Sequence, residues 1–397
     1  MASRSLRPRW LALWLAPLIL ACCMGSSPAV RAVEMRPEPA SLPPVAPPAS
    51  ASPSAPSLPS SLPPALSAGL ASPPRPLFLG RFDFSEPEAP RFSWSGSAIV
   101  ARFSGPRVAI TLEDNGWNWF EVEIDGAKRA PLGAKKGVHE YVLATDLGEG
   151  EHVLRFARRN EAHGGVTRFL GLVFAEGHAL LAPPPRPTRR IEYVGDSITC
   201  GFGTEGAHPC PFEYRTENHE LGYAALAARE LGAEAHTVCW SGWGIVRGAD
   251  GGWGANLPSV YGRTLHKHAQ PAWDAAAFHP DAVVIALGTN DFGAGDPGKD
   301  FVFAYASFLD RLRALHPHAL VVTTTSPMLR GAQKTRQREL IEQAIERSRP
   351  EVGSKVVVLD FPLQGTDAMA CGNHPGRATH ADMASRLVAM LRAELGW

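Results

Sequence analysis

Four residues that lie far apart in the chain are of the types that acyl transfer requires. Ser197 offers a hydroxyl nucleophile, and His374 can take its proton and later return it to the leaving alcohol. The backbone N–H of Gly242 and the side-chain amide of Asn290 can donate hydrogen bonds to the negative oxygen that develops in the transition state. This chemistry requires a fold that brings all four residues together.

Each of these residues, taken alone, also has an ordinary structural explanation. Ser197 follows an Asp, and both types are favoured helix N-caps. Gly242 can be a turn glycine, Asn290 can cap a helix, and a His before a Pro is often only a loop residue. The catalytic interpretation therefore depends on the elements that position the four residues.

The second half of the chain, from residue 190 onward, alternates short apolar runs with longer amphipathic segments. This pattern predicts a three-layer α/β domain with a parallel sheet. The run 282–287 is continuously apolar, as expected for a central strand that is buried on both faces. The expected strands are 190–194, 234–239, 281–287, 319–325 and 355–360, and the expected helices are about 219–231, 298–315, 332–348 and 377–395.

The candidate residues follow the predicted strands in order. Ser197 comes after the first strand, Gly242 after the second and Asn290 after the third, while His374 lies between the fifth strand and the last helix. The carboxyl ends of parallel strands meet at one edge of a sheet. We therefore expect the four residues to form one site.

Residues 77–182 have a different pattern, in which apolar and polar residues alternate with a period of two. Several short strands at this spacing predict an all-β sandwich of jelly-roll type. The clearest strand candidates are 98–103, 107–112, 120–125, 139–143 and 152–156. Trp117 and Trp119 either form a platform for a sugar ring or close the core at the sandwich edge.

The N-terminal region predicts export. Residues 1–23 have a basic start followed by an apolar run, which is typical of a signal peptide. The end of this run resembles a lipobox, so Cys22 is a candidate for lipidation and membrane tethering, with ordinary cleavage as the alternative. Residues 24–76 are rich in Pro, Ala and Ser and are expected to form an extended linker. The mature protein is expected to be either secreted or lipid-anchored at a bacterial cell envelope.

Composition excludes several other classes of function. The formal net charge is zero, so nothing favours nucleic acid as a partner. The four cysteines after the N-terminal region do not form a Cys-x-x-Cys pair, which argues against a zinc site. In an exported protein these cysteines can form two disulfides in three possible pairings, and one hypothesis joins Cys200 to Cys371.

The motifs around the candidate residues resemble those of the SGNH (GDSL-like) hydrolases over about residues 190–397. Segments of the β region resemble carbohydrate esterase family two, whose members place a jelly roll before an SGNH domain. The first set of motifs is Gly195-Asp196-Ser197-Ile198-Thr199, Gly242, Gly288-Thr289-Asn290-Asp291 and His374-Pro375, and the second is Gly80-Arg81-Phe82, Trp94-Ser95-Gly96-Ser97 and Arg158-Arg159-Asn160-Glu161-Ala162. The resemblance implies a polysaccharide deacetylase without a metal or other cofactor.

The roles implied by the resemblance are those of a nucleophile for Ser197, a base for His374 and oxyanion donors for Gly242 and Asn290. The sequence departs from the usual SGNH pattern because no Asp lies two or three residues before His374. We therefore predict a Ser-His dyad in which a backbone carbonyl, that of Asn373, accepts the second imidazole N–H. The alternative is that Asp360 or Asp367 folds back to this position.

The sequence thus predicts an exported esterase that removes O-acetyl groups from a polysaccharide such as acetylated xylan or glucomannan. Of the three tryptophans near the second motif, Trp240, Trp243 and Trp253, we expect Trp243 to flank a sugar ring, with wall packing as the alternative. Two other functions remain open. One is a lipase, thioesterase or deacetylase of another glycan, and the other is a carbohydrate-binding protein that has lost catalysis.

Overall fold

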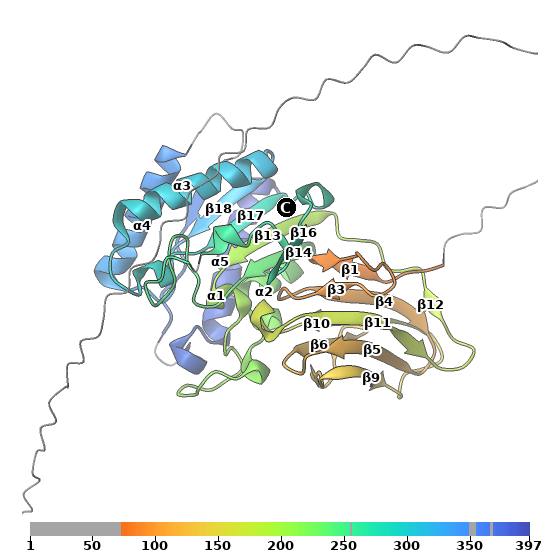
Figure 1. Cartoon of the computed structure of the whole chain (residues 1–397). Helices are drawn as coiled ribbons and strands as arrows, with labels where there is room; N and C mark the ends of the chain where they lie inside the picture. Colours follow the sequence, from red (N-terminus) through yellow and green to blue (C-terminus); the bar gives the residue numbers. More distant parts are fainter. Residues whose placement is uncertain (1–72, 255, 349–354, 366–367) are drawn as a thin grey trace, which may run out of the picture. The chain divides into compact units, whose positions relative to one another are not determined.

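The computed structural model describes residues 73–397, except 255, 349–354 and 366–367. The expected signal peptide and nearly all of the expected linker therefore lie outside the described residues. No helix among the described residues is long and apolar enough to cross a membrane. The described residues form one compact unit. It contains a β region followed by an α/β region (Figure 1).

The β region is a sandwich of two antiparallel sheets, as the period-two pattern predicts. Alternate side chains of both sheets fill one shared core, which includes Phe103, Leu112 and Phe156. The first sheet contains β1 (Leu77–Leu79), β4 (Ala98–Ser104), β10 (Glu151–Arg158), β6 (Trp119–Ile124), β7 (Ala127–Lys128), β8 (Leu132–Gly133) and β12 (Leu180–Leu181); the second contains β2 (Phe82–Asp83), β3 (Arg91–Phe92), β11 (Thr167–Phe174), β5 (Val108–Asp114) and β9 (Gly137–Ala144).

The α/β region contains a five-stranded parallel sheet with the order β14-β13-β17-β18-β19. Its strands are β13 (Arg189–Gly195), β14 (Ala233–Cys239), β17 (Ala282–Ala286), β18 (Leu320–Thr324) and β19 (Val356–Leu359). All five predicted strands are present, and each agrees with its expected range to within one residue or so at either end. A short antiparallel hairpin, β15 (Arg263–Leu265) with β16 (His268–Ala272), is an addition that the sequence pattern does not predict.

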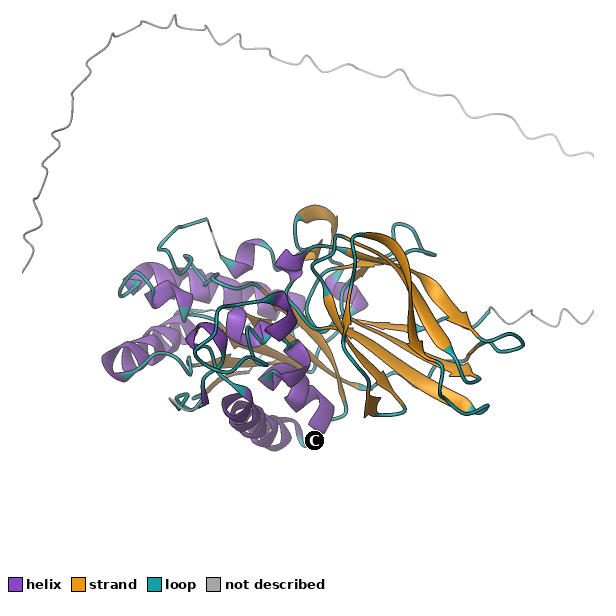
Figure 2. Cartoon of the chain, turned by 90° about the horizontal axis from the view of Figure 1, so that it is seen from below, coloured by secondary structure: helices purple, strands orange, loops and turns teal. Residues whose placement is uncertain are grey.

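Helices cover both faces of this sheet and complete three layers (Figure 2). α3 (Gly298–Leu315) and α4 (Gly331–Arg347) share one apolar core with the sheet, and α2 (Tyr223–Glu230) and α5 (Arg377–Leu395) share the other. The short α1 (Ser197–Cys200) begins directly after β13. The expected helix 219–231 is interrupted, because the 3-10 turn His219–Leu221 precedes α2 and extended Gly222 separates the two.

Buried polar contacts join the sandwich to the parallel sheet. Arg81 of the β1–β2 connection donates to Glu192 of β13 over 2.8 Å, and both side chains are almost completely buried. The indole N–H of Trp94 donates to the carbonyl of Thr264 over 3.0 Å. These contacts fix the sandwich against the sheet that carries the candidate site.

Candidate active site

Ser197 and His374 meet at the carboxyl edge of the parallel sheet. The hydroxyl Oγ of Ser197 lies 2.8 Å from Nε2 of His374, although the residues are 177 positions apart. Ser197 is the first residue of α1, and it is not the helix cap. Asp196 is the cap, since its side chain accepts a hydrogen bond from the N–H of Ile198. The Ser197 hydroxyl is therefore available for the imidazole.

The second imidazole nitrogen of His374 contacts a backbone carbonyl. Nδ1 lies 3.0 Å from the carbonyl oxygen of Gly372. The expectation of a backbone acceptor is thus met, but the choice of Asn373 is wrong. The carbonyl of Asn373 instead accepts a hydrogen bond from the side chain of Gln364 over 2.8 Å. Left-handed backbone at Gly372 and Asn373, with φ of 61° and 59°, folds the loop back so that Gly372 faces the ring.

Of the two alternative carboxylates, Asp360 does not support a triad. Asp360 accepts a hydrogen bond from Thr325 and pairs with Arg338, so its carboxylate is engaged elsewhere. Asp367 lies outside the described residues. The geometry that is present is that of a serine, an imidazole and a carbonyl.

The surroundings of His374 favour its neutral form. Phe202 lies beside the ring, with 4.3 Å between the two ring centroids. Burial lowers the pKa of His374 below its ordinary value, and the Gly372 carbonyl and the negative charge of Glu161 offset part of this effect. A neutral imidazole is the form that can accept the proton of Ser197.

The two expected oxyanion donors follow the strands on either side of β13. Gly242 follows β14 and has a φ of 78°, a conformation that side-chain-bearing residues rarely adopt. Asn290 follows β17, and its amide Nδ2 donates to the carbonyl of Trp243 over 2.9 Å and to Asp196 over 3.3 Å. In the described part of the chain, the N–H groups of Ser197 and Gly242 have no hydrogen-bond acceptor and are free to bind an anion.

Aromatic rings extend from the site in a continuous row. Phe202, next to His374, stacks on Phe212 at 4.2 Å, and Phe212 contacts Tyr214 at 5.3 Å. Tyr214 in turn lies 6.0 Å from Trp117 of the sandwich, whose side chain is 60% exposed. Of the two interpretations of Trp117, core packing is therefore wrong. The sequence pattern did not single out Phe202, Phe212 or Tyr214, which lie in a loop without periodicity.

The tryptophans of the second motif differ in their environment. Trp243 and Trp240 stack on each other, with ring centroids 4.5 Å apart, and both pack partly buried against the core. Trp253 is exposed and lies further along the loop. The wall-packing interpretation thus holds for Trp240. The role of Trp243 beside a sugar ring stays a prediction.

Two disulfides fix the loops around the site, and their pairing differs from the hypothesis. Cys200 pairs with Cys239, and Cys210 pairs with Cys371. The proposed Cys200–Cys371 bridge is wrong because Cys200, in α1, faces the end of the adjacent strand β14. The loop that carries His374 is instead joined to residue 210. The spacing of the cysteines contained no signal for this choice.

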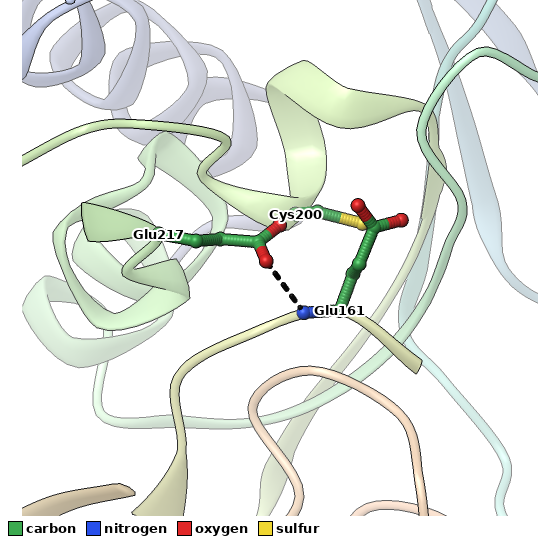
Figure 3. A group of neighbouring side chains, drawn as sticks. All are labelled: Glu161, Cys200 and Glu217. Atoms are coloured by element: carbon green, nitrogen blue, oxygen red, sulfur yellow. Dashed lines mark hydrogen bonds between the residues drawn. The ribbon is translucent and has the colours of Figure 1, made fainter. Parts of the chain in front are cut away.

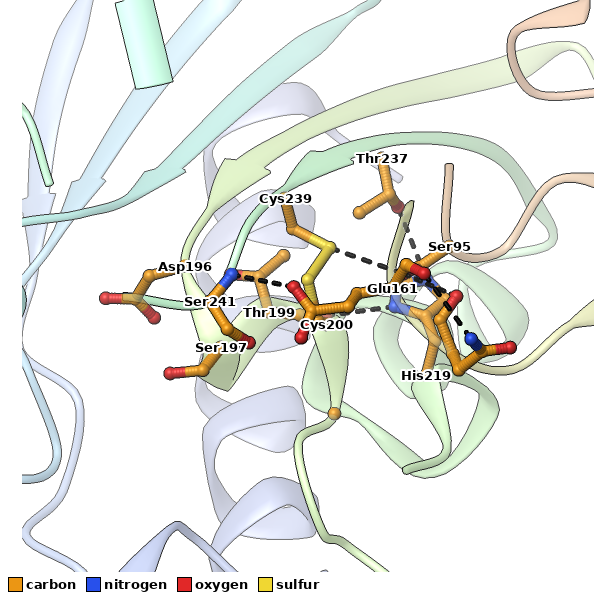
Figure 4. Close-up of a disulfide and its surroundings, with 12 residues drawn as sticks. Ser95, Glu161, Asp196, Ser197, Thr199, Cys200, His219, Thr237, Cys239 and Ser241 are labelled. Carbon is orange, nitrogen blue, oxygen red and sulfur yellow. Dashed lines mark hydrogen bonds between the residues drawn. A yellow bond between two sulfur atoms is a disulfide. The ribbon is translucent and has the colours of Figure 1, made fainter. Parts of the chain in front are cut away.

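The sandwich contributes Glu161 to the same edge of the sheet. Its carboxylate accepts a hydrogen bond from the N–H of Ser241, the residue before Gly242, over 2.8 Å. Figure 4 shows this bond, with the Cys200–Cys239 disulfide beside it. Glu161 belongs to one of the motifs that carry the family resemblance, but the sequence alone did not assign it a place in the site.

Glu161, Cys200 and Glu217 form a cluster whose residue types could suggest a metal site (Figure 3). The sulfur of Cys200 is bonded to Cys239 and is therefore no thiolate ligand. One oxygen of Glu217 accepts the backbone N–H of Glu161 over 3.1 Å, which is a structural hydrogen bond. The donor set does not fit a metal ion.

Comparison with known protein families agrees with this architecture. Residues 78–184 match the family described as carbohydrate esterase 2 N-terminal. Residues 193–383 match the GDSL-like lipase/acylhydrolase family. The two matches cover the sandwich and the α/β region respectively.

Individual relatives have the same two regions. An acetylxylan esterase / glucomannan deacetylase from Cellvibrio japonicus is 30% identical over 336 residues, which cover 82% of this chain and 91% of the relative. The cellulase/esterase CelE from Acetivibrio thermocellus is 36% identical over 324 residues, which cover 81% of this chain and 40% of CelE. The chain thus spans less than half the length of CelE.

Solved structures of carbohydrate esterases are also similar to this chain. A family two carbohydrate esterase from Clostridium thermocellum, solved in complex with cellohexaose, is 36% identical with a TM-score of 0.78, covering 81% of this chain and 99% of that one. A family two carbohydrate esterase from Cellvibrio japonicus is 28% identical with a TM-score of 0.76, covering 82% and 97%. On its sequence, its two matched regions and its fold, this chain belongs to carbohydrate esterase family two.

Proposed function

We propose that this protein is an exported serine esterase that removes O-acetyl groups from a plant-type polysaccharide such as acetylated xylan or glucomannan. The observation that carries the proposal is the contact of 2.8 Å between Ser197 Oγ and His374 Nε2 at the carboxyl edge of the sheet. The relatives named acetylxylan esterase / glucomannan deacetylase support the choice of acetyl group and substrate.

Ser197 acts as the nucleophile and His374 as general base. His374 takes the hydroxyl proton while Ser197 attacks the acetyl carbonyl, and the protonated imidazole then gives the proton to the departing sugar hydroxyl. The imidazole then takes a proton from a water molecule, which attacks the acetyl group on Ser197. Acetate leaves as the imidazole returns the proton to the Ser197 oxygen. The Gly372 carbonyl holds the ring in the tautomer that presents Nε2 to Ser197, because a carbonyl only accepts hydrogen bonds.

The oxyanion forms among donors from three adjacent strands. No described residue accepts the N–H groups of Ser197 and Gly242, which supports an anion site of the kind that helix N-termini and glycine turns provide. Asn290 contributes through the amide hydrogen that makes only a 3.3 Å contact with Asp196. Charge that develops on the substrate oxygen shortens these contacts and lowers the barrier.

The polysaccharide lies along the aromatic row that runs from Phe202 to the exposed Trp117. Aromatic faces suit the apolar C–H faces of sugar rings, and Tyr214 also offers a hydroxyl to a sugar. This row includes residues of both the sandwich and the α/β region. A glycan that follows it extends several sugar units away from the reacting acetyl group.

A second candidate function is glycan binding without turnover, which is favoured by the absence of a carboxylate partner for His374 among the described residues. Acetate release from acetylated xylan and glucomannan distinguishes the two. We expect the wild type to release acetate, and we expect Ser197→Ala and His374→Ala to lose most of this activity. Binding of the glycan with no acetate release by the wild type would instead select the binding function.

Export is supported by the N-terminal sequence and by the two disulfides, which persist in oxidising compartments. The mature protein is either secreted or attached to the envelope through lipidated Cys22. Radiolabelled palmitate incorporation, for the wild type beside Cys22→Ser, separates these two forms. Loss of label in the variant supports the anchor, and a wild type without label supports free secretion.

A further inference from the structure

We propose that the Cys210–Cys371 disulfide is a positioning element of the active site, which holds the loop of the catalytic base against the loop that follows the nucleophile. It thereby performs part of the orienting task that the acid performs in a Ser-His-Asp triad. The inference rests on the proposed function and deepens it, because it explains how a dyad whose acceptor is only a backbone carbonyl keeps its geometry.

The base and its acceptor lie together on the short loop that follows Cys371. Gly372 is the next residue, and its carbonyl oxygen lies 3.0 Å from Nδ1 of His374. Gly372 and Asn373 both have a positive φ, of 61° and 59°. Residues with a positive φ usually occur singly, so two in succession need support from outside the loop. The loop therefore depends on the contacts that surround it.

The loop that follows α1 supplies much of this support. The N–H of Gly372 donates to the carbonyl of Cys210 over 3.1 Å, and the N–H of Cys371 donates to the carbonyl of Gly203 over 3.4 Å. The two segments are also in close contact. A Cβ added to Gly203 would lie 2.7 Å from the Cβ of Cys371, and one added to Gly206 would lie 1.9 Å from its sulfur. The disulfide is thus part of a tight junction between the two loops.

The loop that follows α1 is in turn attached to the nucleophile. The N–H of Phe202 donates to the carbonyl of Ser197 over 3.0 Å. The ring of Phe202 lies beside the imidazole of His374 and stacks on Phe212. Cys210 lies between these two phenylalanines in the chain, so the bridge joins the base to the same loop that packs against its ring. The 2.8 Å contact between Ser197 Oγ and His374 Nε2 depends on how these two loops are placed.

Other contacts keep the base loop attached when the bridge is open. The side-chain amide of Gln364 donates to the carbonyl of Asn373 over 2.8 Å. At the base of the loop, the N–H of Gly376 donates to the carbonyl of Ala368 over 2.7 Å. We therefore expect that loss of the bridge leaves the protein folded and loosens the position of His374 relative to Ser197.

The two disulfides differ in their exposure, which allows a test on the wild type. Cys210 is half-buried, whereas Cys200 and Cys239 are completely buried. A surface cavity of about 350 Å³ is lined by residues 208–211 together with Gly372 and Asn373. Exchange starts when a thiolate reaches a disulfide sulfur. A small dithiol is therefore expected to open the Cys210–Cys371 bridge first.

The opening step is an exchange between one dithiol and one disulfide. A thiolate of the reagent attacks the sulfur of Cys210, and Cys371 leaves as a thiolate. The second thiol of the reagent then displaces Cys210 and closes the reagent's own disulfide. The protein gains two electrons and two protons as two thiols, and the dithiol loses the same number.

The variant that tests the proposal carries Cys210→Ser and Cys371→Ser together, which removes the bridge with little change in side-chain size. We expect kcat for an aryl acetate to fall by about tenfold to 100-fold, with KM changed by less than about twofold, because a misplaced base impairs the chemical step. A loosened loop also admits water to the imidazole, and burial is what lowers the pKa of His374. The acid limb of kcat/KM should therefore move up toward the ordinary His value of ~6.5.

The other groups whose charges act on this imidazole are Glu161 of the sandwich and His380 of α5, and the substitutions leave both in place. The matched control removes the second bridge, through Cys200→Ser and Cys239→Ser. That bridge joins α1 to the end of β14 and not to the loop of His374, so the midpoint of the acid limb should stay in place.

Dithiothreitol applied to the wild type should reproduce the loss of kcat, and reoxidation should restore it. Alkylation and mass mapping identify which cysteines have become thiols. The Cys210→Ser, Cys371→Ser variant has no such bridge to open, so the same mild treatment should leave its rate unchanged. This comparison separates the effect of the bridge from any other effect of the reagent.

Thermal unfolding verifies that each variant is folded, because a bridge with a purely structural role would change only the unfolding temperature. A folded Cys210→Ser, Cys371→Ser variant with wild-type kcat and an unmoved acid limb would overturn the proposal. If this variant does not fold, the dithiol is raised until Cys210 and Cys371 of the wild type are both alkylated, and full activity in that state contradicts the positioning role. Failure of the proposed function is distinct, since Ser197→Ala would then keep wild-type activity.

Discussion

The Nδ1 atom of His374 lies 3.0 Å from the carbonyl oxygen of Gly372, two residues earlier in the chain. A backbone carbonyl fixes the tautomer of an imidazole, as a carboxylate does, but it carries no net charge to stabilise the imidazolium. It also does not titrate. These two properties determine the pH behaviour that we expect of the enzyme.

We expect a single acid limb in the pH dependence of kcat/KM, with its midpoint below 6.5. Burial lowers the pKa of His374, and the base is active only when it is deprotonated, so activity is lost as pH falls through this lowered pKa. Initial rates of acetate release between pH 4 and pH 9 measure the limb, with the range chosen around the ordinary His value of ~6.5. A midpoint above that value would contradict the buried, carbonyl-paired imidazole.

Asn290→Ala should lower kcat by about 100-fold, which corresponds to ~3 kcal/mol, with little change in KM. The amide is needed only when charge forms on the substrate oxygen, so its loss affects the transition state and not binding. The matched control is Asn256→Ala, since Asn256 caps a 3-10 turn in the same domain through Ser259. Equal losses in the two variants would show that the effect is structural.

Trp117→Ala should raise KM for acetylated xylan by about threefold to tenfold and leave the hydrolysis of an aryl acetate unchanged. The exposed Trp117 is the outer ring of the aromatic row. It belongs to the sandwich, whereas the reacting residues Ser197 and His374 belong to the α/β region. The exposed Trp253 provides a control of similar exposure that is not part of the row. An unchanged KM on the polymer would place the glycan elsewhere.

Arg81→Leu should destabilise the protein by about 3–5 kcal/mol, because it leaves the buried carboxylate of Glu192 without its partner. Although burial opposes ionisation, the charge of Arg81 and hydrogen bonds from His316 and Tyr261 lower the pKa of Glu192 to about 2. Its contribution to stability is therefore present above pH 4.5 and is lost as pH falls toward 2.

Chemical denaturation of the wild type and Arg81→Leu at pH 7 and again near pH 3 measures this contribution. The difference between the two proteins should narrow at the lower pH, as Glu192 of the unfolded chain takes up its proton. A difference in unfolding free energy below about 1 kcal/mol at pH 7 would assign the pair no role in joining the two regions.

The sequence predicts the fold well where periodicity is strong. Apolar runs identify every strand of the parallel sheet, and β17 and β18 are buried along their whole length. In the sandwich, β11 escapes the pattern because Gly171 interrupts its alternation and the register shifts between Phe169 and Gly171. The break between His219–Leu221 and α2 depends on the extended backbone of Gly222, which periodicity does not reveal.

The sequence likewise predicts one part of the candidate site and not the other. The strand order alone brings Ser197, Gly242 and Asn290 to one edge, since parallel strands must end there together. The partner of His374 depends on left-handed backbone at Gly372 and Asn373, which no side chain specifies. Glu161 reaches the site through the docking of two regions. That contact is long-range and has no local sequence signal.

The most direct test of the central claim compares acetate release from acetylated xylan by the wild type, Ser197→Ala, His374→Ala and the double variant. Two residues that act as one catalytic unit have non-additive effects. We therefore predict that both single variants and the double variant fall to the same residual rate. If the double variant instead lost the product of the two single effects, or if Ser197→Ala kept the wild-type rate, the Ser197–His374 dyad would be contradicted.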